Sequence, residues 1–278
     1  MTNYLITIIG PTAIGKTSLA IKLAKYFNTE IISADSRQFF KEMCIGTAVP
    51  SATELEAAQH HFIQHKSIFE NYNVGEFERE AIEKIDELFK KNKFVVLVGG
   101  SGLYVDSVIK GLDDFPPIKP EIRDKLTDIL VNEGIESLQN QLKQLDLDQY
   151  KIVDLNNSQR VIRALEVCIS SGKPYSSFLA KNKIKRSFQT IKIGLNTDRE
   201  IIYDRINQRV DIMLENGLMK EAQGLIEHKN LNALQTVGYR ELFEYFDGLI
   251  TKEKAIEEIK KNTRRFAKRQ LTWYRKDE

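Results

Sequence analysis

The chain has 278 residues, of which 42% are hydrophobic and 9% aromatic, so it is long enough to bury a substantial core. Its net charge is only +2, so any affinity for nucleic acid must come from a local cluster of basic residues. No apolar run reaches the roughly 18 residues of a membrane-spanning helix, and Cys44 and Cys168 are too far apart to suggest a disulfide framework. We therefore expect a reduced, cytoplasmic protein without a membrane segment.

The first half of the chain alternates short apolar runs with amphipathic stretches, the pattern of a parallel sheet flanked by helices. Tyr4–Ile9 is predicted as a buried strand, and not as a signal peptide, because it leads directly into a glycine-rich motif. The segment after Gly15 places its apolar residues on one helical stripe. Further strands are predicted at Ile31–Ser33 and Phe94–Val98, with a helix at 76–91 between them.

The glycine-rich motif follows a predicted strand and opens a predicted helix, which is the context that a phosphate-binding P-loop requires. In such a loop backbone N–H groups point inward, and the N-terminus of the helix adds a favourable dipole for an anion. Lys16 supplies a mobile positive charge, and the hydroxyl of Thr17 can bind Mg²⁺. We predict that a diphosphate binds to the whole motif, which consists of Gly10, Pro11, Thr12, Ala13, Ile14, Gly15, Lys16 and Thr17.

A P-loop does not by itself define the reaction. Kinases and ATPases usually hold Mg²⁺ through an acid at the end of another buried strand, whereas Phe94–Val98 is followed by Gly-Gly-Ser-Gly-Leu-Tyr. The acid that does follow a strand is Asp35. Because the carboxyl ends of parallel strands face the ligand crevice, Asp35 is a candidate general base toward a second substrate, or a metal ligand. The plainer alternative is a solvated loop aspartate that caps the next segment.

The second half of the chain is predicted to be mainly helical. From Glu121 to about Ser187 only helical patterns occur, and Ile191–Leu195 then indicates a return to the sheet. Two more helical stretches are expected after this strand, the second beginning at about Lys252.

The predicted fold class is α/β, with a P-loop-type parallel-sheet core and a helical insertion domain. Residues 1–114 are expected to form the first part of the core and residues 115–189 the insertion. Residues 190–278 would complete the core and end in a basic helix.

This last helix carries basic residues and no acid between Lys260 and Lys276. Positions 261, 264, 265, 268 and 269 fall on adjacent rows of one helix and form a stripe. Trp273 and Tyr274 offer flat surfaces for a base or a guanidinium group. The stripe fits an RNA-binding surface, although a run of charge is more often a solvated helix face and a lone Trp is often a core residue.

Two pairs of side chains stand four residues apart. Arg205 and Arg209 would point the same way on a helix and could hold a diphosphate, or they could be ordinary surface arginines. His61 and His65 could share a helix face, but no nearby carboxylate or cysteine completes a zinc-binding set.

Several motifs occur in one order along the chain, namely GPTAIGKT, ISADSRQ, IGTAVP, VLVGGSGLY, NNSQRVIRALEV, TVGYRE and RRFAKRQLTWYR. In this combination the chain resembles the tRNA dimethylallyltransferase family over nearly its whole length. The resemblance implies an enzyme that transfers a dimethylallyl group from dimethylallyl diphosphate to the exocyclic amine of the adenine immediately 3′ of the anticodon, releasing diphosphate. It implies a channel that the diphosphate enters from the P-loop side and a flipped-out adenine enters from the other side.

The resemblance also implies partners and residue roles. The partners would be a tRNA anticodon stem-loop and dimethylallyl diphosphate, the cofactor Mg²⁺ bound at Thr17, and the protein a monomer. Asp35 would accept the proton of the adenine amine, and Thr17 and Arg209 would steady the diphosphate leaving group. The implied tRNA-contacting residues are Asp35, Ser36, Arg37, Gln38, Ser101 (in place of the usual Thr), Arg123, Gln159, Arg160, Val161, Ile162, Arg163, Gln235, Gly238, Tyr239, Arg240, Lys268, Arg269, Gln270, Trp273 and Arg275.

Three alternatives stay open on the sequence. An adenylate isopentenyltransferase performs the same chemistry on free AMP or ADP, but it needs neither the insertion nor the basic stripe. A small-molecule or nucleotide kinase is disfavoured by the missing acid after Phe94–Val98. A non-catalytic RNA-binding P-loop protein would bind tRNA and leave dimethylallyl diphosphate unconsumed.

Overall fold

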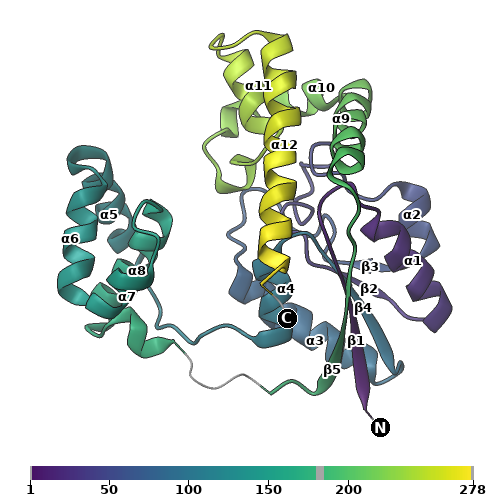
Figure 1. Cartoon of the computed structure of the whole chain (residues 1–278), viewed down its shortest axis with the longest axis horizontal. Helices are drawn as coiled ribbons and strands as arrows, with labels where there is room; N and C mark the ends of the chain where they lie inside the picture. The colour runs from purple at the N-terminus through teal and green to yellow at the C-terminus, as the bar shows by residue number, and fades with distance from the viewer. Residues whose placement is uncertain (1, 180–184, 277–278) are drawn as a thin grey trace. The chain divides into compact units, whose positions relative to one another are not determined.

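A computed structural model describes residues 2–179 and 185–276 of the chain (Figure 1). Five parallel strands form one sheet in the order β3-β2-β4-β1-β5. The strands are β1 (Asn3–Ile9), β2 (Ile31–Ser33), β3 (His60–His61), β4 (Phe94–Val98) and β5 (Phe188–Gly194). The predicted α/β class is thereby confirmed, and β1, β2 and β4 lie where the sequence predicts them.

Two strands differ from the prediction, and both lie at an edge of the sheet. β3 is too short to leave an alternating pattern in the sequence. β5 begins at Phe188, three residues before the predicted start. The prediction missed this start because an edge strand exposes polar residues, here Gln189 and Lys192, which interrupt the apolar pattern. Residues 188 and 189 therefore belong to the sheet and not to the predicted insertion.

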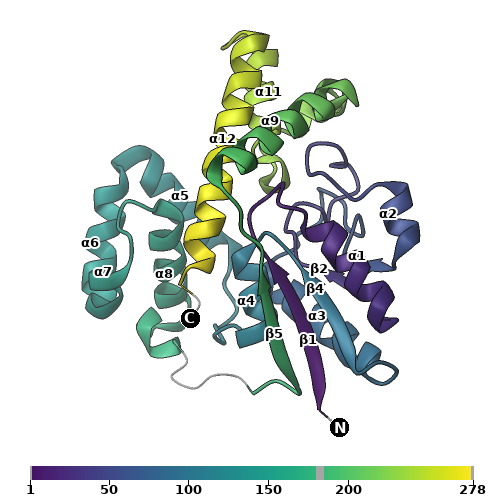
Figure 2. The same ribbon diagram turned by 45° about the vertical axis from the view of Figure 1, so that its right-hand side comes forward.

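Helices cover both faces of the sheet, which explains why β4 is apolar along its whole length. Val96 and Val98 pack against α1 (Lys16–Phe27), whereas Val95 and Leu97 belong to the larger cluster with α3 (Val74–Phe89). Figure 2 shows the strands between α1 on one side and α3 with α4 (Gly102–Lys110) on the other. A short helix, α2 (Ala52–Ala57), precedes β3.

The chain divides into two compact units, Met1–Gly111 with Lys185–Glu278 and Leu112–Ile184. The second unit contains α5 (Pro120–Glu133), α6 (Ile135–Leu145), α7 (Leu147–Ile152), α8 (Ser158–Ser171) and a 3₁₀ turn at Tyr175–Phe178. It has a separate apolar core, in which Leu126, Leu138 and Leu165 are almost fully buried. Its described residues contain no strand, as the helical patterns predicted.

Four α-helices follow β5, where the sequence analysis expected two helical stretches. They are α9 (Arg199–Glu215), α10 (Leu218–Gln223), α11 (Tyr239–Phe246) and α12 (Lys252–Tyr274), with 3₁₀ turns at Ile226–His228 and Asn232–Leu234. The two extra helices were missed because α10 and α11 span only six and eight residues, too few for a clear helical period. No helix of the described ranges is long and apolar enough to cross a membrane.

Candidate active site

The P-loop joins β1 to α1 in a strained, closely packed turn. Ala13 and Gly15 have φ angles of 63° and 104°, in the left-handed region that favours glycine. At Gly10 a Cβ atom would lie 2.7 Å from the backbone oxygen of Leu195, just beyond β5. The Nζ atom of Lys16 donates hydrogen bonds to the carbonyl oxygens of Gly10 and Pro11, at 3.0 and 2.8 Å. The loop is thus closed by its own lysine, and the first N–H groups of α1 lack partners within the helix.

Lys16 is a half-buried cation. Burial lowers the pKa of its ammonium group to about 8, the carboxylate of Asp35 opposes this shift, and the guanidinium of Arg209 adds to it. Burial also lowers the pKa of Arg209. Two half-buried cations that lie close enough to repel each other favour binding of an anion between them.

A cavity of about 670 Å³ lies over the P-loop. Thr12, Ala13, Gly15, Lys16 and Thr17 of the predicted diphosphate site line it, together with Asp35, Arg205 and Arg209. Ile14 instead packs its side chain against Ile202 and Ile206 of α9, so its contribution to the loop is through the backbone. Cationic side chains and the N-terminus of a helix therefore line the same cavity.

A second cavity, of about 400 Å³, shares a wall with the first. The residues that line both cavities are Thr12, Asp35, Thr47, Ala48, Arg209 and Met213. The rest of the lining of the second cavity includes seven residues predicted to contact tRNA, which are Ser36, Arg37, Ser101, Gln235, Gly238, Arg240 and Arg269, and also apolar residues such as Val210, Leu218 and Phe266. Asp35 and Arg209 therefore stand where two separate ligands could approach the same point.

The residues after β2 hold this wall in place. The Oδ1 atom of Asp35 accepts the backbone N–H of Arg37 at 3.1 Å. The hydroxyls of Ser36 and Ser101 lie 3.0 Å apart, so the hydroxyl kept at position 101 has a partner in the fold. Arg37 donates to the carbonyl oxygens of Asn232 and Ala233, and Gln38 donates to those of Thr47 and Ala48. The side chains of Arg37 and Gln38 thus join segments of the site to one another.

Glu221 of α10 is a site residue that the sequence analysis missed. Its carboxylate accepts the consecutive backbone N–H groups of Cys44, Ile45 and Gly46, at 3.0, 2.8 and 2.9 Å. It also accepts the hydroxyl of Tyr239 at 2.6 Å. These four bonds fix the segment that continues into Thr47 and Ala48, the shared wall of the two cavities. No sequence signal marks Glu221, because an acid on a short polar helix is usually solvent-exposed.

The sequence profile of a family described as IPP transferase matches residues 38–277. The tRNA dimethylallyltransferases of Flavobacterium psychrophilum and Christiangramia forsetii are each 64% identical to the chain. These alignments cover 99% and 100% of the chain and 92% of each relative. The chain belongs to the IPP transferase family. The family predicted from the motifs and the enzyme class, a prenyltransferase, are both confirmed.

Solved structures of the family have the same fold. A tRNA isopentenylpyrophosphate transferase from Bacillus halodurans superposes with a TM-score of 0.70 at 39% identity, over 98% of this chain and 87% of that one. A eukaryotic dimethylallyltransferase acting on tRNA gives a TM-score of 0.81 at 30% identity, over 98% of this chain and 70% of that one.

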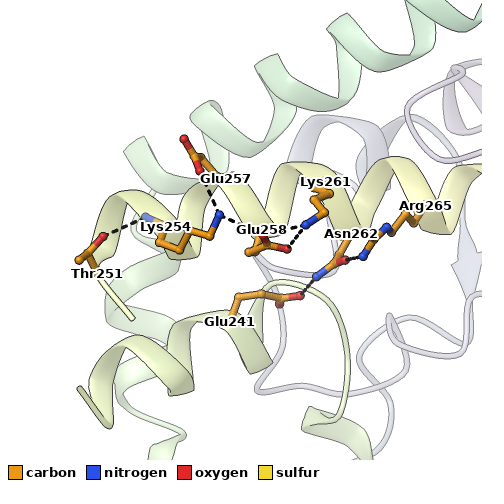
Figure 3. Close-up of polar contacts among 8 residues, drawn as sticks. All are labelled: Glu241, Thr251, Lys254, Glu257, Glu258, Lys261, Asn262 and Arg265. Atoms are coloured by element: carbon orange, nitrogen blue, oxygen red, sulfur yellow. Dashed lines mark hydrogen bonds and ion pairs between the residues drawn. The ribbon is translucent and has the colours of Figure 1, made fainter. Parts of the chain in front are cut away.

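The basic stripe of this IPP transferase family member divides into two parts. Lys260 pairs with Asp211. Lys261 pairs with Glu258, and Arg265 donates to Asn262, which in turn donates to Glu241 (Figure 3). Arg264 donates to Asn207 and lies over the ring of Tyr203. The exposed basic residues of the second part are Lys268, Arg269, Arg275 and Lys276. The predicted five-residue stripe is therefore corrected, since its first three positions are engaged within the protein.

Two predicted tRNA contacts in the core unit, Tyr239 and Gln270, are buried in the fold, and a third, Trp273, is bonded to it. Tyr239 is fully buried and Gln270 is 6% exposed, with both ends of its amide bonded to the backbone. Trp273 is 37% exposed, but its indole N–H donates to Asp106 at 3.0 Å. The side chains of Tyr239 and Gln270 cannot reach RNA from these positions, and we withdraw them from the predicted tRNA surface.

In the helical unit, too, some predicted tRNA contacts are buried and others are exposed. Val161 and Ile162 are buried in its core and are also withdrawn, whereas Gln159 and Arg160 are exposed. Arg123 and Arg163 both pair with Glu166, whose side chain is 1% exposed. Part of their positive charge is thus neutralised by a buried acid that the sequence analysis did not single out.

The two histidines considered as a zinc pair do not share a helix. His61 lies in β3 and contacts Glu30, whereas His65 lies among the rings of Phe39, Phe62 and Tyr72. Burial lowers the pKa of His65 to about 4, which keeps the ring neutral. The residues that the structure describes contain no group of three His, Cys, Asp or Glu residues that could hold a metal ion.

Proposed function

We propose that the protein transfers a dimethylallyl group from dimethylallyl diphosphate to the exocyclic amine of the adenine immediately 3′ of the anticodon in tRNA, with release of diphosphate. The observation that carries this proposal is the pair of cavities that meet at Asp35 and Arg209. One cavity contains the P-loop, and the other is lined by the polar and basic residues expected at the RNA side. The identity to relatives named tRNA dimethylallyltransferase supports it.

The larger cavity would bind the donor. Its diphosphate would lie on the N–H groups at the start of α1, with Lys16 and Arg209 on either side. As the bond between the allylic carbon and oxygen breaks, negative charge grows on the departing diphosphate. Cations and N–H groups that are already in place stabilise this charge without reorganising. Arg209 can hold two oxygens at once through its planar fork.

Mg²⁺ is compatible with this site, with Thr17 as the residue that would hold it. Mg²⁺ in phosphate sites keeps several waters and takes few protein ligands, so the absence of a three-residue cluster in the described ranges does not argue against it. When bound, the ion would neutralise part of the diphosphate charge. Glu54 also lines this cavity, so its carboxylate would lie in the same cavity as the bound ion.

The smaller cavity would bind the flipped adenine beside Asp35. The amine nitrogen attacks the allylic carbon, the carbon–oxygen bond breaks, and the electron pair leaves with the diphosphate. The proton released by the amine passes to the Asp35 carboxylate. Such base assistance typically contributes about 10²–10⁴-fold to the rate, so positioning of the two substrates must supply most of the acceleration.

The tRNA backbone would be bound by exposed residues of each unit. In the core unit these are Gln235, Arg240, Lys268, Arg269 and Arg275, and in the helical unit Gln159, Arg160 and the partly exposed Arg123 and Arg163. Because tRNA is the acceptor, the protein would act in the cytoplasm.

One assay distinguishes this function from its rivals. The protein is incubated with radiolabelled dimethylallyl diphosphate and either unmodified tRNA or AMP. Label in tRNA, and loss of that label when the adenine 3′ of the anticodon is replaced by another base, supports the proposal. Label in AMP alone would mean an adenylate isopentenyltransferase, and no label with tightly bound tRNA would mean a binding protein.

A further inference from the structure

The last turns of α12 are anchored on the loop that follows β4. The hydroxyl of Tyr274 donates to the carbonyl oxygen of Gly99 at 3.3 Å, and the ring of Trp273 lies so close to Gly102 that a Cβ there would be 2.4 Å from it. The Nε2 atom of Gln270 donates to the carbonyl oxygen of Gly100 at 2.9 Å. Figure 1 shows this end of α12 beside α4. This face of the helix is therefore built against the core, whereas Lys268 and Arg269 are exposed.

Gln270 also reaches the P-loop. Its Oε1 atom accepts the backbone N–H of Thr12 at 2.8 Å, although the two residues are 258 positions apart in the chain. The hydroxyl of Thr12 in turn accepts a hydrogen bond from Arg209 at 3.4 Å. One buried amide thus joins three segments: the P-loop, the loop after β4 and the basic terminal helix.

The chemistry of this position requires one acceptor and one donor, and the primary amide of Gln270 supplies both. The side chain must accept at one end and donate at the other, which a carboxylate or an ammonium group cannot do. A Cβ atom at Gly100 would lie 2.5 Å from the Nε2 atom of Gln270, so a larger residue there would displace the amide. Neither an isolated RNA-binding helix nor an isolated P-loop would need this arrangement.

We propose that Gln270 is a positioning residue for the donor site. It fixes Thr12, and through Thr12 the curve of the P-loop and the place of Arg209, so that the terminal helix forms part of the diphosphate site as well as the RNA-facing surface. The assignment rests on the proposed function only for the identity of the donor, since its test uses inorganic diphosphate and no RNA.

The first test compares the affinity for inorganic diphosphate of Gln270→Met, which keeps the length of the side chain and removes both hydrogen bonds, with that of wild type. Leaving a buried N–H and a buried carbonyl unpaired is expected to weaken diphosphate binding roughly tenfold or more. Thr272→Val is the matched control, because Thr272 is exposed on the same helix and its hydroxyl donates to the carbonyl oxygen of Lys268 in that helix. Its diphosphate affinity should equal that of wild type.

The second test separates positioning from a general loss of stability. A charged glutamate in Gln270→Glu can still accept the Thr12 N–H, but it opposes the carbonyl oxygen of Gly100 and the incoming diphosphate. A protonated glutamate carries one donor and one acceptor and so imitates the amide. The charged groups on the surrounding segments are Lys16, Asp35, Asp106 and Arg209, and all four are present in both proteins. The comparison is made below the pKa of Lys16, about 8, so that the ratio of variant to wild type reports the change at position 270.

We expect the diphosphate affinity of Gln270→Glu, divided by that of wild type at the same pH, to rise as the pH is lowered from about 7 to about 5.5. Burial beside the carbonyl oxygen of Gly100 should raise the pKa of the introduced carboxyl above its usual value of about 4.3, into this range. Thermal melts identify folded variants. The proposal is overturned if folded Gln270→Met binds diphosphate within twofold of wild type, or if the ratio for Gln270→Glu does not change with pH. If Gln270→Met does not fold, the pH ratio alone decides.

Discussion

The hydroxyl of Tyr239 donates a 2.6 Å hydrogen bond to the carboxylate of Glu221, and the ring of the same tyrosine presses against Gly46. A Cβ atom at Gly46 would lie 2.6 Å from that ring. Glu221 meanwhile holds the N–H groups of Cys44, Ile45 and Gly46. The wall between the two cavities therefore depends on a buried tyrosine and a carboxylate from α10, neither of which has to touch a substrate.

Gly46→Ala is expected to displace this wall and to lower both stability and transfer. The buried ring of Tyr239 cannot move without breaking its bond to Glu221, so the free energy of unfolding should fall by about 1–3 kcal/mol. Gly224→Ala is the control, because its φ is −66° and the nearest atoms to an added Cβ are 3.6 Å away. Urea denaturation and single-turnover rates check both variants. Equal stabilities of the two would contradict the role of the Tyr239 contact.

Asp35→Asn should lose prenyl transfer while binding tRNA normally. The amide keeps the shape of the side chain and its acceptor for the Arg37 N–H, but it cannot take up a proton. The single-turnover rate with unmodified tRNA should fall by about 10²–10⁴-fold. Asp204→Asn, an exposed position on α9, should react at the wild-type rate. A rate for Asp35→Asn within tenfold of wild type would remove Asp35 from the role of base.

Arg209→Lys should act on the diphosphate end of the reaction. Lysine keeps the charge but loses the planar fork and cannot reproduce the contact with Thr12 while holding two diphosphate oxygens. A loss of about 10²–10³-fold in the transfer rate is expected, the size seen when one donor to a developing anion is removed. Thr17→Ala should likewise weaken dimethylallyl diphosphate binding or slow transfer. Impaired tRNA binding alone, in either variant, would show that the residue belongs to the acceptor side.

The affinity of the free protein for inorganic diphosphate should decrease as the pH rises through about 8, because burial has lowered the pKa of Lys16 to that value and its charge is lost there. Titration calorimetry from pH 7 to 9 measures this, and Lys16→Met corrects for the protonation of diphosphate itself. The unfolded chain keeps the proton up to about 10.5, so between about 8 and 10.5 it binds more protons than the folded protein. Lys16 should therefore make the protein more stable toward higher pH within that window. A wild-type profile parallel to that of Lys16→Met would contradict the lowered pKa.

Charge removal from the two halves of α12 should have different effects on tRNA binding. The exposed set, Lys268→Gln, Arg269→Gln and Arg275→Gln together, should weaken binding and reduce the slope of log K against log salt by about 0.7–0.9 for each phosphate that the protein no longer neutralises. The control set is Lys254→Gln, Lys260→Gln and Lys261→Gln. Lys254 pairs with Glu257 and Lys261 with Glu258 (Figure 3), and Lys260 pairs with Asp211. Filter-binding titrations over a range of salt, on variants with intact thermal melts, give both slopes. Equal changes of slope in the two sets would mean that the exposed half is only a solvated surface.

Local features of this protein could be predicted from its sequence because they are formed by consecutive residues. The P-loop is eight consecutive residues, within which Lys16 bonds to the carbonyl oxygen of Gly10, and β1, β2 and β4 are apolar because helices bury both faces of the sheet. Asp35 could be found in the same way, since the end of a parallel strand determines which edge of the sheet its next residues face. The order of the motifs was enough to identify the family.

The pairing of distant residues was decided only by the tertiary structure. Gln270 and Thr12 are 258 positions apart, and Glu221 lies 177 positions from Cys44, so no periodicity in the chain connects them. A glutamine or a glutamate in a polar helix has the same sequence pattern whether it faces water or a buried backbone N–H. The sequence therefore determined which groups carry the chemistry. The packing of α10 and α12 onto the core determined which side chains are exposed to RNA and which hold the site in place, because burial depends on neighbours that only the folded chain brings together.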